Sequence, residues 1–223
     1  MTEATRALVI GDVAGHLGEL RWALCINGVD VDAATVPEDL VVVQVGDLIH
    51  RGPDSAGVIA LVDRFLRGPS GGRWIQLIGN HEQPYLFNEP TVIARTLDEP
   101  SVATMRSWWA EGLTQVATSI SPDWQQVVVP RRMRSARPAG DILITHAGLT
   151  YGAWLELGRP GTATDAAASI NAGARAPSSP WIRSIVMADL ADVRLEERGA
   201  RVHPGLGVAG FAAQHPDRPQ QGA

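Results

Sequence analysis

Four short apolar segments in this sequence each end in a polar side chain beside a glycine. The segments are residues 8–10, 40–45, 74–78 and 141–145. The polar residues that follow them are, in order, Asp12, Asp47, Asn80 with His81, and His146. Between the first three segments, apolar residues recur at helical spacing over residues 17–26 and 58–66. Strands that alternate with helices in this way predict an α/β fold with parallel pairing at its centre.

The remaining pattern is weaker but still predicts regular structure. Three more helices are expected, over residues 91–112, 164–175 and 181–198. A strand is expected over residues 124–129, and a weak apolar run follows over residues 206–213. Trp22 and Trp74 lie inside apolar patterns, so we expect both in the core.

The chain length allows one well-buried core. With 223 residues, the sequence is interpreted as a single domain over residues 1–223. The polar tail, about residues 216–223, is expected to fray. No internal repeat divides the chain.

The polar residues after the strands are the candidate functional residues. In open α/β sheets, ligands bind at the carboxyl ends of the strands, where these side chains would gather. Asp and Asn also follow strands for a simpler reason, because their side chains cap the next helix. Four such ends in order, all offering oxygen or imidazole ligands, favour a shared metal or phosphate site over four separate caps.

Composition excludes several other kinds of chemistry. All 19 basic residues are arginines, so mechanisms that need a lysine base or a Schiff base are excluded. The single cysteine, Cys25, forms neither an internal disulfide nor a thiolate zinc cage. A net charge of −5 argues against nucleic acid as a partner. The sequence has no signal pattern and no apolar stretch of membrane-spanning length, so we expect no membrane partner and a cytoplasmic location.

The motifs, taken in order, resemble the calcineurin-like metallophosphoesterase superfamily. They read G-D-x-x-G, G-D-x-x-x-R-G, G-N-H-E and T-H-A-G, and they cover about residues 6–150. The likeness is strongest to the bacterial branch that includes diadenosine tetraphosphatases and serine/threonine phosphatases. The resemblance implies a four-layer αββα sandwich with mixed sheets and a metal site at the strand ends. It also implies two divalent metal ions, such as Mn, Fe or Zn.

The resemblance also assigns roles to single residues. It implies that Asp47 bridges the two ions and that Asp12 binds the first ion. Asn80 and His146 would bind the second ion, and Asn80 would also contact substrate. His81 would give a proton to the leaving group and Arg51 would clamp the phosphate, with a metal-bound hydroxide attacking phosphorus. Arginine suits that task because its planar fork matches two phosphate oxygens, and an imidazole can donate a proton near neutral pH.

Three departures from the superfamily pattern leave alternatives open. Ala14 stands where a metal-binding histidine is expected, and His16 either replaces that ligand or merely opens the following helix. His50 stands where the phosphatase branch often has an aspartate; it either contacts substrate at the site or is a surface turn residue. The closing histidine ligand is His215, His203 or neither. Glu82 either orients His81 or is simply an acid in the first turn of a helix.

These observations lead to one functional hypothesis and one rival. The hypothesis is a metal-dependent phosphoesterase that hydrolyses phosphate esters or nucleotide phosphoanhydrides. Its substrate would be a phosphorylated small molecule, a nucleotide polyphosphate or a phosphoprotein. The rival is a degenerate member of the superfamily that binds metal or phosphate with little or no turnover, and Ala14 is the main reason to consider it.

Overall fold

The computed structural model describes residues 6–86, 97–120, 125–128 and 141–176. Its larger sheet has five parallel strands in the order β4-β3-β2-β1-β6. These strands are β1 (Arg6–Ile10), β2 (Leu40–Gln44), β3 (Trp74–Leu77), β4 (Thr114–Gln115) and β6 (Gln125–Val128). The smaller sheet pairs β5 (Ala117–Ile120) with β7 (Ile142–Thr145) in antiparallel fashion.

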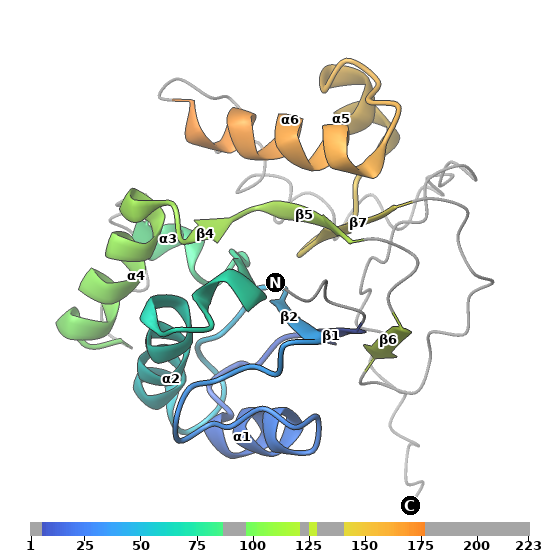
Figure 1. Cartoon of the computed structure of the whole chain (residues 1–223). Helices are drawn as coiled ribbons and strands as arrows, with labels where there is room; N and C mark the ends of the chain where they lie inside the picture. The colour runs from blue at the N-terminus through green and yellow to red at the C-terminus, as the bar shows by residue number, and fades with distance from the viewer. Residues whose placement is uncertain (1–5, 87–96, 121–124, 129–140, 177–223) are drawn as a thin grey trace, which may run out of the picture.

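The helices lie outside the two sheets, so the described part of the chain forms four layers (Figure 1). On the outer side of the larger sheet are α1 (Leu17–Cys25), α2 (Ser55–Arg67) and α4 (Glu99–Glu111). Beyond the smaller sheet are α5 (Tyr151–Glu156) and α6 (Ala163–Arg175). Two short helices, η1 (Gly71–Arg73) and α3 (Gln83–Leu86), flank β3. The αββα sandwich expected from the sequence is therefore confirmed.

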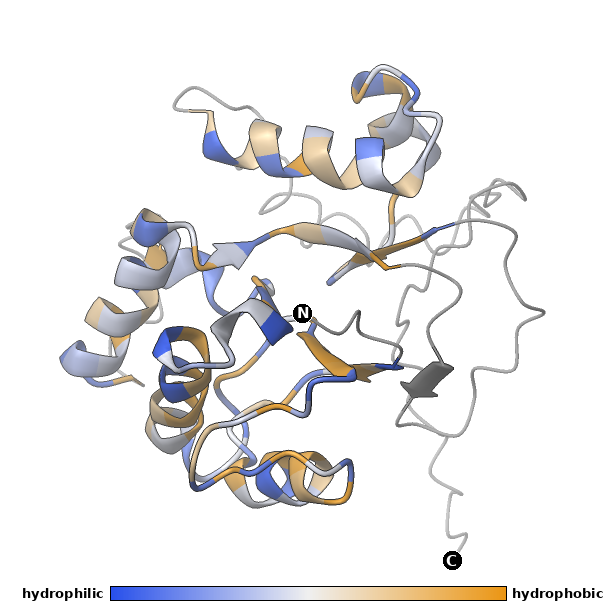
Figure 2. Ribbon diagram, viewed as in Figure 1, coloured by the Kyte–Doolittle hydropathy of each residue, from blue (hydrophilic) through white to orange (hydrophobic). Residues whose placement is uncertain are grey.

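Three apolar cores separate the four layers, and strand alternation assigns residues to them. In β1, Leu8 packs toward the helices, whereas Ala7 and Val9 pack toward the smaller sheet. The core between the sheets consists of Ala7, Val9, Val41, Val43, Val45, Leu77, Ile120, Ile142 and Ile144. Because β2 is buried on both faces, its sequence is a nearly continuous valine run rather than an alternating one. Figure 2 shows this apolar colouring along β1 and β2.

Helix α2 supplies more buried residues than any other element to the core on the outer side of the larger sheet. Asp54 caps its first turn by accepting a hydrogen bond from the Gly57 amide. Its buried residues recur at helical spacing and are Val58, Ile59, Leu61, Val62, Phe65 and Leu66. Phe65 stacks on Trp74 with ring centroids 4.6 Å apart, which confirms the expected core position of Trp74.

The expectation that Trp22 is a core residue is wrong, since 62% of its surface is exposed. Helix α1 buries Leu20 and Leu24, which lie four residues apart on one face. Trp22 is two residues from each of them, about 200° around the helix axis, so it faces solvent. Cys25 is also exposed.

The other predicted elements differ in how far the structure describes them. Of the helix expected over residues 91–112, the structure has α4 from Glu99 to Glu111; Leu97 and Asp98 are not helical, and residues 91–96 lie outside the described residues. The strand expected over residues 124–129 is present as β6. The helix expected over residues 164–175 is α6. The elements expected over residues 181–198 and 206–213 and the tail lie outside the described residues. The single-domain interpretation stays a prediction.

No helix in the described ranges is long and apolar enough to cross a bilayer. The cytoplasmic location stays a prediction, as do the partners expected from the sequence.

Strands β4 and β5 were not expected from the sequence, and Asn171 of α6 holds the chain between them. Its Oδ1 accepts hydrogen bonds from the amides of Val116 (2.8 Å) and Ala117 (3.0 Å). Its Nδ2 donates to the Ala117 carbonyl at 2.8 Å. One side chain from a distant helix therefore satisfies the backbone where the chain passes from one sheet to the other.

We expect Asn171→Ala to lower the free energy of unfolding by about 2 kcal/mol, because two partly buried amides and one carbonyl lose their partners. Urea denaturation measures this loss. Ser169→Ala in the same helix serves as the control and should change the stability by less than about 0.5 kcal/mol. Equal stability of the two variants would show that Asn171 does not hold this crossing.

Candidate metal centre

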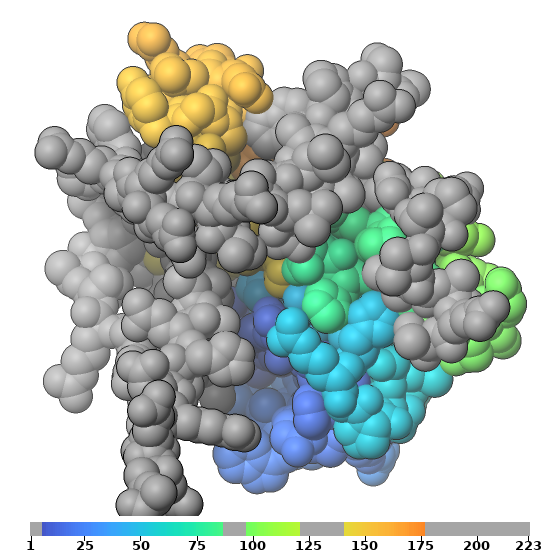
Figure 3. Space-filling model, turned by 180° about the vertical axis from the view of Figure 1, so that it is seen from behind, coloured from blue at the N-terminus to red at the C-terminus, as the bar shows by residue number. Residues whose placement is uncertain are grey.

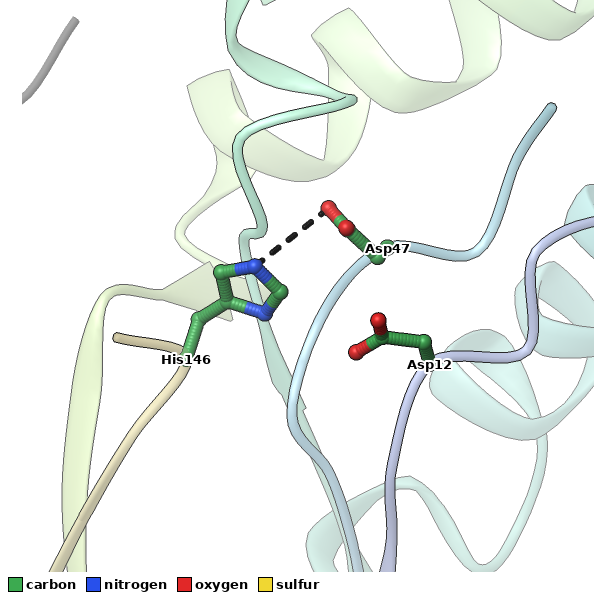
Figure 4. Close-up of side chains that lie close together, drawn as sticks. All are labelled: Asp12, Asp47 and His146. Carbon is green, nitrogen blue, oxygen red and sulfur yellow. Dashed lines mark ion pairs between the residues drawn. The ribbon is translucent and has the colours of Figure 1, made fainter. Parts of the chain in front are cut away.

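Three side chains from three strand ends converge at one edge of the sandwich (Figure 4). Asp12 follows β1, Asp47 follows β2 and His146 follows β7. One ligand atom from each lies within 4.8 Å of the other two. Asp47 is buried, with 4% of its surface exposed, whereas Asp12 is exposed, so the cluster is open on the Asp12 side. The structure thus brings together the strand ends of both sheets, as expected from the sequence.

The direction of the His146 ring follows from its hydrogen bonds. Its Nδ1 lies 3.0 Å from the carbonyl oxygen of Val45. A carbonyl can only accept, so Nδ1 carries the hydrogen and Nε2 of the neutral ring carries a lone pair. That lone pair faces Oδ1 of Asn80 at 2.9 Å and Oδ1 of Asp47 at 3.5 Å.

A cation would fit this arrangement, because three atoms that can act as metal ligands lie around the same space. Nε2 of neutral His146, the amide oxygen of Asn80 and the carboxylate of Asp47 all offer lone pairs to the same space. The Val45 carbonyl behind His146 is the kind of outer partner that fixes a metal-binding imidazole. Mixed oxygen and nitrogen donors suit Mn, Fe or Zn. The residues present therefore fit the divalent ions that the family resemblance implied, while the number and identity of the ions stay predictions.

Asp47 is held by backbone geometry as well as by neighbours. Its φ is +55°, a left-handed conformation that few side chains adopt. The preceding Gly46 has a φ of +105°, and a Cβ there would collide with the backbone of Ile78 and Gly79. The carboxylate accepts a hydrogen bond from the His81 amide at 3.0 Å. These constraints fix the Asp47 carboxylate before any ligand arrives.

Glu82 connects the two loops that carry Asp47 and Asn80. Its buried carboxylate accepts hydrogen bonds from the backbone amides of Asp47, Leu48 and Gly79, each at 2.8 Å. Burial raises the pKa of Glu82 to about 7, and the nearby Asp47 charge adds to this rise. The structure thus gives Glu82 a role that neither sequence interpretation named. Its place in the G-N-H-E motif was the only signal.

The loops after β1 and β2 are also bonded to each other. The amides of Ala14 and Gly15 donate to the carbonyls of Asp47 and Leu48, each at 2.8 Å. Ala14, Asp47, His50 and Arg51 all have positive φ, so backbone strain gathers at this point. Ala14 therefore lies on the loop bonded to Asp47, but its methyl group offers no ligand.

His16 lies apart from the converging side chains of the described residues. It occupies the N-cap position of α1 and is exposed. Its Nδ1 is 3.9 Å from the Glu19 carboxylate, one turn along the same helix. The arrangement matches the alternative that His16 opens the helix, and its role as a ligand stays a prediction. His203 and His215 lie outside the described residues, so the closing ligand also stays a prediction.

The two remaining imidazoles, His50 and His81, are in contact. Nε2 of His81 lies 3.9 Å from Oδ2 of Asp47. Nδ1 of His81 lies 2.8 Å from Nδ1 of His50, whose Nε2 lies 2.8 Å from the hydroxyl of Tyr85. Burial lowers the pKa of His50, and the neighbouring His81 adds to this lowering. Arg51 is exposed on the same loop, where its side chain can reach solvent-borne anions.

Replacing Glu82 with glutamine tests the connection between the loops. Three backbone amides now donate to the two carboxylate oxygens of Glu82. A glutamine has only one acceptor oxygen, so at least one amide would lose its partner, and we expect the free energy of unfolding to fall by about 2–3 kcal/mol. Urea denaturation at pH 8 gives this value. Glu156→Gln, at an exposed position near the end of α5, is the control. A Glu82→Gln protein as stable as the control would contradict the assigned role.

Metal affinity tests which residues are ligands. For metal-stripped protein titrated with Mn²⁺ by calorimetry, we expect Asp47→Asn and His146→Ala each to weaken binding by at least about tenfold, as loss of a ligand should exceed loss of an outer partner. His16→Ala should leave the affinity unchanged. A loss for His16→Ala as large as that for Asp47→Asn would identify His16 as a ligand.

Comparison with known proteins gives a family and a fold. Residues 5–166 match the model of the family described as calcineurin-like phosphoesterase. Two solved structures of a cold-active protein tyrosine phosphatase, one a point mutant, are similar to this chain at 18% and 19% identity, with TM-scores of 0.53 and 0.51. The matches cover 85% and 94% of this chain. They cover only 54% and 58% of the phosphatase chains, so this chain spans little more than half of their length. At such low sequence identity, the likeness concerns the fold. The family match covers well over half of the sequence, and the chain belongs to the calcineurin-like phosphoesterase family.

Proposed function

We propose that this chain is a metal-dependent hydrolase of phosphate esters or nucleotide phosphoanhydrides. The observation that carries the proposal is the set of lone-pair donors that converge at the strand ends. Asp47, Asn80 and His146 face one another there, and Asp12 completes the group on the open side. Two further groups suited to phosphate chemistry, Arg51 and His81, lie on the adjoining loops.

Divalent ions held by these four residues would supply Lewis acidity for the phosphoryl oxygens and for the attacking water. The protein supplies the geometry. Asp47 is fixed by its backbone conformation and by the His81 amide, so its carboxylate does not need to reorganise when substrate arrives. Asp12 is exposed, which leaves that side of the site open to a phosphorylated substrate.

Arg51 and His81 divide the work on the substrate. The guanidinium of Arg51 can bind two phosphoryl oxygens through its planar fork and stays charged at any working pH. His81 presents Nε2 on the side of Asp47, from which it can donate a proton to the leaving oxygen. Asn80 and His50, which the sequence suggested as substrate contacts, lie on the same two loops.

The substrate class is part of the proposal. A phosphorylated small molecule, a nucleotide polyphosphate or a phosphoprotein would each present a phosphoryl group to this site. The G-D-x-x-x-R-G and G-N-H-E motifs support the branch that includes diadenosine tetraphosphatases and serine/threonine phosphatases.

A second candidate function is metal or phosphate binding without turnover. The observation that favours it is Ala14. This residue lies on the loop bonded to Asp47, where a metal-binding histidine is expected, but its methyl group offers no ligand. His16, the alternative ligand, is exposed beside Glu19. Retention of Asp12, Asp47, Arg51, Asn80, His81 and His146 together supports the hydrolase instead.

Hydrolysis assays test the proposal. Metal-stripped protein would be supplied with Mn²⁺ and offered p-nitrophenyl phosphate, its bis ester, diadenosine tetraphosphate and a phosphopeptide. We expect metal-dependent turnover that falls by at least about a hundredfold in Asp47→Asn, because the fixed carboxylate is lost. Asp32→Asn, at an exposed carboxylate between α1 and β2, should keep full activity.

The relative rates of hydrolysis of the four substrates then indicate which branch of the superfamily the activity resembles. A folded protein that binds Mn²⁺ but hydrolyses none of the four substrates would contradict the hydrolase and support the binding protein.

A further inference from the structure

Two stacked aromatic rings follow the candidate ligand His146 closely in the chain. Tyr151 and Trp154 of α5, here called the aromatic pair, have ring centroids 5.6 Å apart and an angle of 26° between their planes. Tyr151 is 52% exposed, which makes it one of the few large hydrophobic side chains at the surface of the described residues. A flat ring of a ligand can therefore stack beside it.

Helix α5 and the turn after it hold the aromatic pair in place. The Thr150 hydroxyl caps the helix by accepting a hydrogen bond from the Ala153 amide at 3.2 Å. Nε1 of Trp154 donates to the Pro160 carbonyl at 3.2 Å, and the Trp154 carbonyl accepts from the Arg159 amide at 3.0 Å. Because the Trp154 ring is already fixed at both ends, a ligand that stacks on the pair orders few further side-chain bonds.

The aromatic pair belongs to the end of the smaller sheet where the candidate ligands gather. His146 follows the carboxyl end of β7, and α5 begins five residues later, at Tyr151. Five residues span at most about 18 Å, which bounds the distance from the ligand to the pair. Figure 3 shows α5, in yellow, on the same face as the segments that follow β2 and β3, in cyan and green. One extended ligand can therefore contact the metal centre and the pair together.

The charges suit a ligand with an anionic end and an uncharged ring. The charged residues of α5 and its following turn, Glu156 and Arg159, are both exposed and have opposite signs. The aromatic pair therefore lies in a stretch without net charge, which favours a neutral ring over a phosphate. The phosphate belongs instead at the metal centre, where Arg51 is exposed.

The separation of the two contact points distinguishes the substrate classes. A phosphorylated serine or threonine carries no ring, and the ring of a phosphotyrosine is bonded through one oxygen to the phosphorus itself. In a nucleotide polyphosphate, a ribose and further phosphates lie between the base and the reacting phosphorus. Only the nucleotide has its own ring at a distance from the phosphoryl group, as the positions of His146 and the aromatic pair require.

We propose that the aromatic pair stacks on a nucleobase and that Tyr151 makes this chain specific for nucleotide polyphosphates. The proposal rests on the function proposed above and selects one of its substrate classes. Stacking on an aromatic side chain tolerates any of the bases, since each has a π face. The pair would supply binding energy far from the reacting phosphorus, so its loss should raise KM and leave kcat unchanged.

The first test measures binding without turnover. Methylenediphosphonate and its adenosine 5′-ester share a P–C–P bridge that is not hydrolysed, and they differ only in the nucleoside. With Mn²⁺ present, we expect calorimetry to show that the parent protein binds the ester about tenfold more tightly, as stacking of one base provides. Tyr151→Ala should remove this preference, whereas Tyr151→Phe, which keeps the ring, should retain it.

Trp22→Ala is the matched control, because it removes another exposed aromatic ring, from α1, and should leave the preference intact. A parent protein that binds both compounds equally would overturn the proposal alone. So would an unchanged preference in Tyr151→Ala, or an equal loss in Trp22→Ala. A parent protein that binds neither compound would overturn the proposed function, and this proposal with it.

The second test is kinetic and compares diadenosine tetraphosphate, inorganic tripolyphosphate and a phosphopeptide. We expect Tyr151→Ala to raise KM for diadenosine tetraphosphate about tenfold at constant kcat, and to leave both constants for tripolyphosphate unchanged. A rise in KM for the phosphopeptide alone would overturn the proposal and identify the pair as a peptide contact. Equal losses on all three substrates would also overturn it, because a general loss of structure has no preference for a base.

Discussion

The hydrogen bonds from three backbone amides to the buried carboxylate of Glu82 are the constraint on which the site depends. They join the loop after β2 to the loop after β3, and so fix Asp47 relative to Asn80 and His81. An apolar side chain could fill the same space but would leave three amides without partners. The two loops approach so closely at Gly46 and Gly79 that a Cβ on Gly46 would collide with the Gly79 backbone. The relative positions of the candidate ligands therefore depend on Glu82, whose carboxylate is bonded to backbone amides of both loops.

Much of the fold could be predicted because its central strands are buried on both faces. Such strands are short apolar runs, and β1, β2 and β3 were recognisable from composition and from the polar residues that end them. Strands β4 and β5 were not, because their sequences, Thr-Gln and Ala-Thr-Ser-Ile, carry little apolar signal. They are kept in place by Asn171, more than fifty residues away along the chain. Trp22 was misplaced because an apolar residue within a helix has no fixed face until its neighbours are known.

The candidate site was predictable in its members but not in its connections. Asp12, Asp47, Asn80 and His146 follow strands, and the rule that ligands gather at strand ends brought them together correctly. The tautomer of His146 could not be predicted, since it depends on a carbonyl about a hundred residues earlier. The contacts of Glu82 and His50 are equally non-local, and their partners include backbone groups that carry no sequence signal.

The two carboxylates of the cluster follow strands of the larger sheet, whereas His146 follows a strand of the smaller one. The interface between these sheets is made of valine, isoleucine, leucine and alanine, whose attraction has no preferred direction and resists sliding only through the shapes of side chains. A cation shared across the seam would act differently, because coordination bonds have defined lengths and angles. Ligands from both sheets bound to one ion would hold the two sheets at a fixed separation and orientation. Ion binding and the mutual alignment of the two halves would then be a single equilibrium, each favouring the other.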